Sequence, residues 1–154
     1  MSENKSEIGK YLREQNIKFN EIVLENEVHS VNDVANLVQC DANEVLKALV
    51  FISNEFCVLV IINGANNLNK EKLEIQIQQK VKLADKTKVF EVTGFEVGTV
   101  SPFILNTKNN FKVIASNSIL RNRQFFIGSG TKNVLIQINK EEFFKVFKGQ
   151  FIDL

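Results

Sequence analysis

The sequence has few of the residues on which several common kinds of site depend. Its 154 residues include one histidine, two cysteines, one methionine, one proline and no tryptophan. Cys40, Cys57 and His29 are too few for a Cys/His zinc site, and no Cys-x-x-Cys pair occurs, so we expect no metal or other cofactor. A Ser-His-Asp triad could use only His29, which lies at a predicted helix start, where a capping or surface role is the simpler interpretation.

Charge and hydropathy exclude further classes of protein. The net charge is +1, whereas a protein that grips a long nucleic-acid duplex has a strong basic excess, so any contact with RNA should be small. Apolar runs such as residues 57–62 are far shorter than the roughly twenty residues of a membrane helix. The polar N-terminus lacks the apolar core of a secretory signal. We therefore expect a cytoplasmic protein that does not contact membranes.

The basic residues of the C-terminal third allow two interpretations. They could form a modest patch that reaches RNA phosphates, or they could be a solvated face, which is the usual arrangement of scattered lysines. These residues are Lys140, Lys145, Lys148, Arg121 and Arg123.

The apolar pattern and the turn signals predict a single α+β domain over residues 1–154. Strand candidates are 19–24, 45–51, 56–62, 81–83, 111–115, 124–127 and 133–138. Helix candidates lie around 8–12 and at 31–38, 69–78, 85–92 and 141–148. Because strands and helices are interspersed and two hairpins occur, we expect a mixed, mainly antiparallel sheet with flanking helices.

One loop, residues 93–103, concentrates two glycines and the only proline of the chain. Gly98 is free to adopt positive φ and Pro102 fixes φ near about −65°, so together they restrain the residues between them. Backbone N–H groups held in this way can point outward and suit an ester carbonyl or a phosphate. Taken alone, the loop is more simply explained as a tight turn between two elements.

A single cation, Lys47, interrupts the apolar strand at 45–52. A lysine in such a strand is usually explained by a snorkelling stem or by protection of an edge strand against pairing. The functional alternative is an ammonium group placed in a cleft.

Lys47 and this loop belong to a series of four blocks. The blocks are His29-Ser30-Val31 at a helix start, the lysine strand, the loop 93–103, and Gly128-Ser129-Gly130 before the last strand. In this order and spacing they resemble the aminoacyl-tRNA deacylase family that includes the bacterial deacylase YbaK and the prolyl-tRNA editing domain. The resemblance runs from residue 18 onward and implies a curled, barrel-like sheet.

The resemblance implies hydrolysis of the ester that joins a wrongly attached amino acid to the terminal ribose of tRNA. Because that ester is already activated, the catalyst needs positioning, an oriented water and stabilisation of negative charge rather than a strong nucleophile. We expect the backbone N–H groups of residues 98–101, which include Gly98 and Ser101, to bind the carbonyl oxygen or the oxyanion. Lys47 would contact the terminal phosphate, the ribose or the carbonyl, or act in proton transfer.

The remaining residues implied by the resemblance bind the substrate. The segment Gly128-Ser129-Gly130, called the glycine turn below, would form the opposite wall of the cleft and offer the Ser129 hydroxyl. A simple hairpin turn explains the same residues. The substrate-binding candidates are His29, Thr99, Val100, Pro102, Gly128, Ser129 and Gly130. The expected partners are the acceptor end of a mischarged tRNA and an aminoacyl-tRNA synthetase, and the expected state is a monomer.

Three positions depart from the family pattern. Ala48 stands where relatives often have Ser or Thr, Ser116 where they often have Asp, and Leu135 where some have an acidic residue. These differences leave open which amino acid is removed. They also motivate a second hypothesis, a non-catalytic module with the same fold that binds tRNA or a synthetase. A general oligonucleotide-binding domain is disfavoured by the nearly neutral charge.

Overall fold

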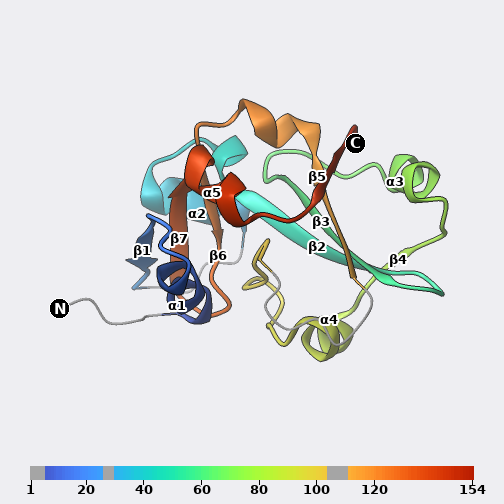
Figure 1. The fold of residues 1–154 in the computed structure, drawn as a ribbon, viewed down its shortest axis with the longest axis horizontal. Helices are drawn as coiled ribbons and strands as arrows, with labels where there is room; N and C mark the ends of the chain where they lie inside the picture. The colour runs from blue at the N-terminus through green and yellow to red at the C-terminus, as the bar shows by residue number, and fades with distance from the viewer. Residues whose placement is uncertain (1–5, 26–29, 104–110) are drawn as a thin grey trace.

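The strands of the protein form two sheets, seen in a computed structural model that describes residues 6–25, 30–103 and 111–154 (Figure 1). The first sheet has the order β1-β7-β6, with β1 (Asn20–Val23), β7 (Val134–Asn139) and β6 (Gln124–Gly128). The second has the order β4-β2-β3-β5-β8, with β4 (Lys82–Leu83), β2 (Leu46–Ile52), β3 (Cys57–Asn63), β5 (Phe111–Ser116) and β8 (Gln150–Ile152). An isolated parallel bridge between Val45 and Phe126 joins the two sheets.

The expected mixed, mainly antiparallel architecture is confirmed. The pairings β1–β7, β2–β3, β2–β4 and β6–β7 are antiparallel, whereas β3–β5 and β5–β8 are parallel. The expectation of a curled, barrel-like sheet is not supported, because neither sheet closes on itself within the described residues. The physical reason is that β2 and β6 approach each other at one bridge and then diverge, so that the strands divide into two sheets.

Helices flank both sheets, and their caps follow from the sequence. Ser30, Asn69 and Asp85 each accept a hydrogen bond from the N–H group three residues further on, which satisfies a free donor of the first turn. Gly94 ends its helix in the left-handed region with φ of 78°. The helices are α1 (Glu7–Glu14), α2 (Val31–Val38), α3 (Lys70–Ile77), α4 (Lys86–Thr93) and α5 (Lys140–Val146), with short 3-10 turns η1 (Ala42–Glu44) and η2 (Asn117–Arg121). None of the described helices is long and apolar enough to span a bilayer.

Side chains of β2 alternate between two hydrophobic cores on the opposite faces of its sheet. Leu46 and Val50 pack in the larger core, while Phe51 packs in a smaller core with Leu73 of α3. Because side chains alternate along a strand, Lys47 leaves β2 on the face of the smaller core.

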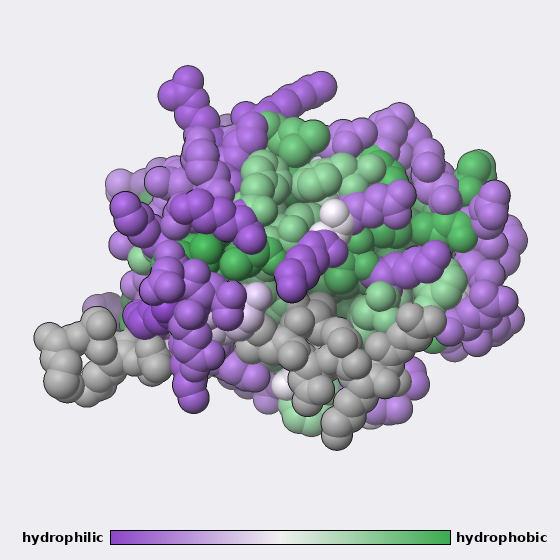
Figure 2. Space-filling model, viewed as in Figure 1, coloured by the Kyte–Doolittle hydropathy of each residue, from purple (hydrophilic) through white to green (hydrophobic). Residues whose placement is uncertain are grey.

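The loop 93–103, called the glycine loop below, is attached to the larger core through aromatic rings. Phe103 at its end lies 5.3 Å from Phe143 of α5, and Phe143 lies 4.7 Å from Phe125 of β6, measured between ring centroids. These rings fix the end of the loop relative to β6. On the same side of the molecule, Figure 2 shows apolar side chains gathered across the middle of the face with hydrophilic residues around them.

Glu142 joins α5 to the segment that connects α1 with β1. Its Oε1 accepts a hydrogen bond of 2.7 Å from the Lys18 backbone N–H, and its Oε2 pairs with the Lys145 ammonium group. The hydrogen bond from Lys145, followed by that from Lys18, lowers the pKa of the Glu142 carboxyl, and burial opposes this effect only in part.

We expect Glu142→Gln to lower the melting temperature near neutral pH and to have little effect in acid. A carboxyl whose pKa is lowered by folding contributes stability above its ordinary pKa, and this contribution is lost as pH falls below about 4.5. Thermal unfolding of both proteins across this pH range checks the prediction. Glu141→Gln is the matched control, because Glu141 is exposed in the same first turn of α5. A difference that stays constant with pH would contradict the role of the carboxylate.

Candidate functional site

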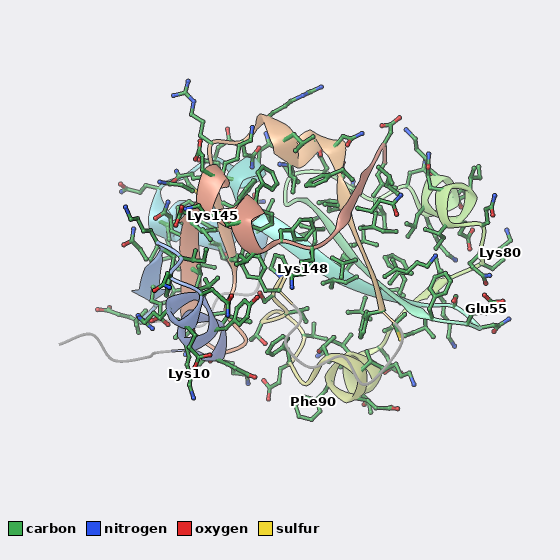
Figure 3. The ribbon with its side chains drawn as sticks, in the orientation of Figure 1. Lys10, Glu55, Lys80, Phe90, Lys145 and Lys148 are labelled. Carbon is green, nitrogen blue, oxygen red and sulfur yellow. The ribbon has the colours of Figure 1, made fainter. Side chains whose placement is uncertain are left out.

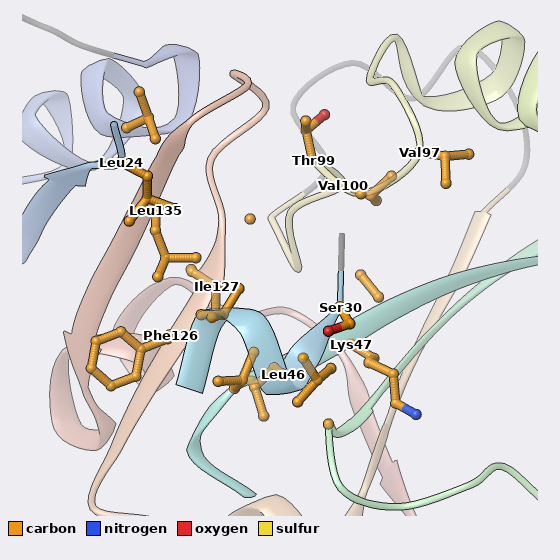
Figure 4. A pocket seen from close by; sticks show the side chains of 18 of the residues that line it. Leu24, Ser30, Leu46, Lys47, Val97, Thr99, Val100, Phe126, Ile127 and Leu135 are labelled. Atoms are coloured by element: carbon orange, nitrogen blue, oxygen red, sulfur yellow. The ribbon is translucent and has the colours of Figure 1, made fainter. Parts of the chain in front are cut away.

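A pocket of about 770 Å³ lies where the two sheets separate (Figure 4). Its walls are the start of β2, the end of β6, the start of α2, the glycine loop and the turn before β7. Most of the lining is apolar and includes Leu24, Val34, Leu46, Phe126 and Leu135. The pocket therefore exists because β2 and β6 diverge beyond the bridge at Val45.

The residues predicted from the sequence to form the site divide into three groups. The structure brings together at this pocket Lys47, Gly98, Thr99, Val100 and Gly128. Near it, but not among the residues that line it, are Ser101, Pro102, Ser129 and Gly130. His29 lies outside the described residues. The lysine strand and the glycine loop, distant in sequence, are thus two walls of one pocket.

The backbone of the glycine loop is only partly hydrogen-bonded. The N–H and Oγ1 of Thr99 both donate to the Glu96 carbonyl, at 2.9 and 2.8 Å, and Gly98 has a φ of 91°. Within the described residues the N–H groups of Gly98, Val100 and Ser101 have no hydrogen-bond acceptor. Unpaired main-chain donors in a largely buried loop are the groups that can bind a carbonyl oxygen or an anion.

The glycine turn holds this loop in place. A Cβ atom at Gly128 would lie 2.5 Å from the Val100 oxygen and 2.8 Å from the Thr99 oxygen. Gly130 has a φ of 80° and donates its N–H to the Thr99 oxygen at 2.8 Å. The two glycines therefore allow the backbone of the loop to approach β6 closely.

Two serines of the predicted site serve the local turns. The Ser129 hydroxyl is buried and lies 2.6 Å from the Val134 oxygen, which it bonds within the hairpin. The Ser101 hydroxyl accepts the Phe103 N–H at 3.0 Å. For Ser129 this geometry favours the hairpin-turn interpretation over a hydroxyl that faces the substrate.

The Lys47 side chain is half-buried, and its ammonium group makes no hydrogen bond or ion pair within the part of the chain that the structure describes. It leaves β2 on the face of the smaller core, whereas the glycine loop packs in the larger core through Phe95 and Val100. Figure 4 shows its side chain running away from Thr99 and Val100. Of the roles open to the lysine, contact with a phosphate or ribose at the side of the pocket is therefore favoured over contact with the substrate carbonyl.

The charged residues of the described lining are both lysines, and its other polar side chains are hydroxyls and amides. Lys132 lines the pocket beside the glycine turn, and its Nζ lies 3.2 Å from Glu96 Oε2, an exposed ion pair that links the turn to the glycine loop. No acidic residue is among the described residues of the lining, and no group of possible metal ligands occurs in the described parts of the chain. Lys132 was not predicted from the sequence, although its place two residues after Gly130 was a usable signal.

Two of the three departures from the family pattern lie at the pocket. Ala48 and Leu135 line it, whereas Ser116 caps η2. The Ser116 hydroxyl lies 2.9 Å from that of Ser118, which in turn donates to the buried side chain of Asn63. The substitution at 116 therefore affects the support of β3, and those at 48 and 135 affect the pocket wall.

The basic residues of the C-terminal third are partly used inside the protein. Lys145 pairs with Glu142, and the Lys140 ammonium group donates to the Leu120 carbonyl. Figure 3 shows Lys145 and Lys148 on the same side of the molecule. Because two of the ammonium groups already have partners, the solvated-face interpretation is favoured over an RNA-binding patch.

Comparison with known proteins gives matches over most of the chain. The sequence model of the aminoacyl-tRNA editing domain matches residues 25–146. The proline--tRNA ligase of Pediococcus pentosaceus is 29% identical over 126 residues, which are 80% of this chain and 22% of the ligase. That of Thermosipho melanesiensis is 28% identical over 142 residues, 90% of this chain and 25% of the ligase. The chain thus spans a quarter or less of the length of these curated relatives.

Solved structures share the fold at low sequence identity. A hypothetical protein superposes with a TM-score of 0.84 at 22% identity, over 94% of this chain and 95% of that one. A protein described as a proposed trans-editing enzyme for prolyl tRNA synthetase superposes with a TM-score of 0.79 at 21% identity, over 88% and 85% of the two chains. These likenesses establish the fold.

Proposed function

Because the chain belongs to the aminoacyl-tRNA editing domain family, we propose that it is a freestanding trans-editing hydrolase that removes a wrongly attached amino acid from tRNA. Water adds to the carbonyl carbon of the aminoacyl ester, the bond to the ribose oxygen breaks, and a free amino acid and a tRNA with its ribose hydroxyl are released. The observation that carries the proposal is the set of unpaired N–H groups of the glycine loop at a pocket that also contains Lys47.

The glycine loop supplies the electrostatic part of the catalysis. The N–H groups of Gly98 and Val100, which line the pocket, stabilise the negative charge that develops on the carbonyl oxygen, and each such donor contributes on the order of a hundredfold in rate. Their rigidity comes from the contacts of Gly128 and Gly130 with the loop, so the donors need not reorganise during the reaction. Pro102 serves the same purpose by fixing the backbone at the end of this segment.

Lys47 binds the terminal phosphate or ribose of the acceptor end. An ammonium group without a protein partner attracts a phosphate, and no carboxylate of the described lining competes for it. The physiological partner is then the single-stranded end of a mischarged tRNA in the cytoplasm, which a monomer of nearly neutral charge can bind through few contacts.

A non-catalytic module that binds tRNA or a synthetase is the second candidate. Ala48 and Leu135, which depart from the family pattern, both line the pocket. A pocket altered at two positions of its wall could retain binding and lose hydrolysis.

A panel of tRNAs mischarged with different amino acids tests the choice between the two candidates. We expect the purified protein to release at least one amino acid faster than buffer alone, measured as loss of acid-precipitable label. Correctly charged samples of the same tRNAs are the control. If none of the panel is hydrolysed while uncharged tRNA still binds, the binding module is the function.

A further inference from the structure

One edge of β2 faces the pocket without a partner strand. On its other edge β2 pairs with β3 along its whole length, from Leu46 to Ile52. On the pocket edge β4 pairs only with Phe51 and Ile52, and the bridge to β6 involves only Val45. Residues 47–49, all of which line the pocket, pair with no strand on this edge within the described parts of the chain.

Hydrogen bonds at the two ends of β2 identify the main-chain groups on this edge. The Val45 oxygen accepts from Gly64 at 2.6 Å on the β3 side, and the Val50 oxygen accepts from Ala84 at 2.9 Å on the β4 side. Successive residues of a strand direct their N–H and C=O groups to alternate edges. Ala48 therefore directs both groups to the pocket edge, and neither has a partner among the described residues.

An unpaired strand residue is complementary to one amino acid. Two opposed residues of an antiparallel pair exchange two N–H···O bonds, one on each side of their α-carbons. An aminoacyl ester has the same arrangement, with an amino group and a carbonyl group on either side of one α-carbon. The described lining has no carboxylate, and the Ala48 oxygen is an acceptor without a partner on this edge, so it can accept from the ammonium of this ester.

We propose that the free edge of β2 at Ala48 binds the aminoacyl group as a strand of one residue, an inference that rests on the proposed function. The Ala48 oxygen accepts from the α-ammonium group, and the Ala48 N–H donates to the acyl carbonyl together with donors of the glycine loop. The methyl group of Ala48 packs toward the larger core, so recognition uses the main chain. Relatives often have a Ser or Thr hydroxyl at this position, and its absence here does not affect a contact made by the main chain.

Two analogues that cannot be hydrolysed test this directly: 3′-alanylamido-3′-deoxyadenosine and its 3′-propionamido counterpart, which lacks the amino group. We expect the first to bind roughly ten- to a hundredfold more tightly, the range of one hydrogen bond to a charged group. In spectra of the 15N-labelled protein the Ala48 amide should shift on titration, while the amides of Lys47 and Leu49, which face β3, should shift less. Equal affinities, or an Ala48 signal that does not move, would overturn the inference.

Ala48→Pro gives an independent test. Proline removes the N–H that faces the pocket and leaves the bonds between β2 and β3, whereas Leu49→Pro removes a bond to β3. We expect Ala48→Pro to fold and to bind both analogues more weakly than the wild type, because both contain the acyl carbonyl that the Ala48 N–H would bind, and we expect Leu49→Pro to unfold. A folded Ala48→Pro that binds both analogues as tightly as the wild type would overturn the inference. If Ala48→Pro does not fold, the wild-type titration decides alone.

These tests are separable from the test of the function. If the protein deacylates a tRNA of the panel but the NMR signal of the Ala48 amide does not shift, the proposed hydrolase function is supported and the strand-edge contact is rejected. An Ala48 signal that moves in a protein that hydrolyses nothing would support the contact and reject the hydrolase.

Discussion

Lys47→Ala lowers kcat/KM for a mischarged tRNA roughly 10- to 100-fold, the loss that follows when a charged group is deprived of its hydrogen-bond partner. The Lys47 ammonium group has no partner within the described residues, so its removal breaks no side-chain hydrogen bond or ion pair there and the fold should persist. Because the amine runs away from the glycine loop, we expect it to contact the acceptor end rather than the reacting carbonyl. The loss should therefore appear mainly in KM, since phosphate is bound equally before and during the reaction.

Steady-state kinetics at several salt concentrations measure this effect. The wild-type KM should rise with salt, and the dependence should be weaker in Lys47→Ala because one phosphate contact is gone. Lys47→Arg retains the charge and should recover part of the loss. Lys112→Ala is the matched control, since Lys112 is a strand lysine of the same sheet that lies over Phe56 and not at the pocket. If Lys47→Ala reacts as fast as the wild type, the role given to the lysine is wrong.

Gly128→Ala should both destabilise the protein and abolish most of its activity. The new Cβ would lie 2.5 Å from the Val100 oxygen, a backbone atom that can retreat only if the glycine loop moves. Overpacking of this kind costs about 1–3 kcal/mol. A displacement of about 1 Å in the donors lowers the rate on the order of a hundredfold. The effect on kcat should exceed the effect on KM, because these donors act on the developing charge.

Gly94→Ala is the control that separates the two effects of replacing a glycine, a steric clash of the new Cβ with nearby atoms and strain of the backbone at positive φ. Gly94 also has positive φ, but a Cβ there meets no atom within 4 Å. This variant should lose about 1–2 kcal/mol through strain in the left-handed region and keep its activity. Urea unfolding gives the stability of each variant, and deacylation is assayed well below both melting temperatures. A Gly128→Ala protein that is as active as Gly94→Ala would refute the account of the glycine turn.

Most elements of the fold could be predicted because their signals are local. Ser30, Asn69 and Asp85 start helices as expected, Gly94 ends one, and both predicted hairpins occur. The missed strand, β8, has three residues and is held by parallel pairing with β5. Division of the strands into two sheets depends on where β2 meets β6, a long-range contact on which local propensity has no influence.

Which residues belong to the site could be predicted from the sequence more readily than where their side chains point. Motif spacing identified Lys47, Gly98 and Gly128, which the structure brings to one pocket. The direction of Lys47 was not accessible, because the strand around it is apolar on both faces and its alternation does not distinguish them. The unpaired edge at Ala48 could not be predicted from the sequence either, because it depends on which strand lies beside β2 and not on the identity of the side chain.

The bridge between Val45 and Phe126 also has a consequence for synthesis of the chain. Val45 and Phe126 are separated by about eighty residues of sequence. The pairing of β3 with β5 likewise joins segments that are far apart in the sequence. Contacts between such distant segments form late, because the loop between them must close first. On the ribosome, the lysine strand therefore emerges long before β6, and the binding pocket cannot form until β6 has also emerged.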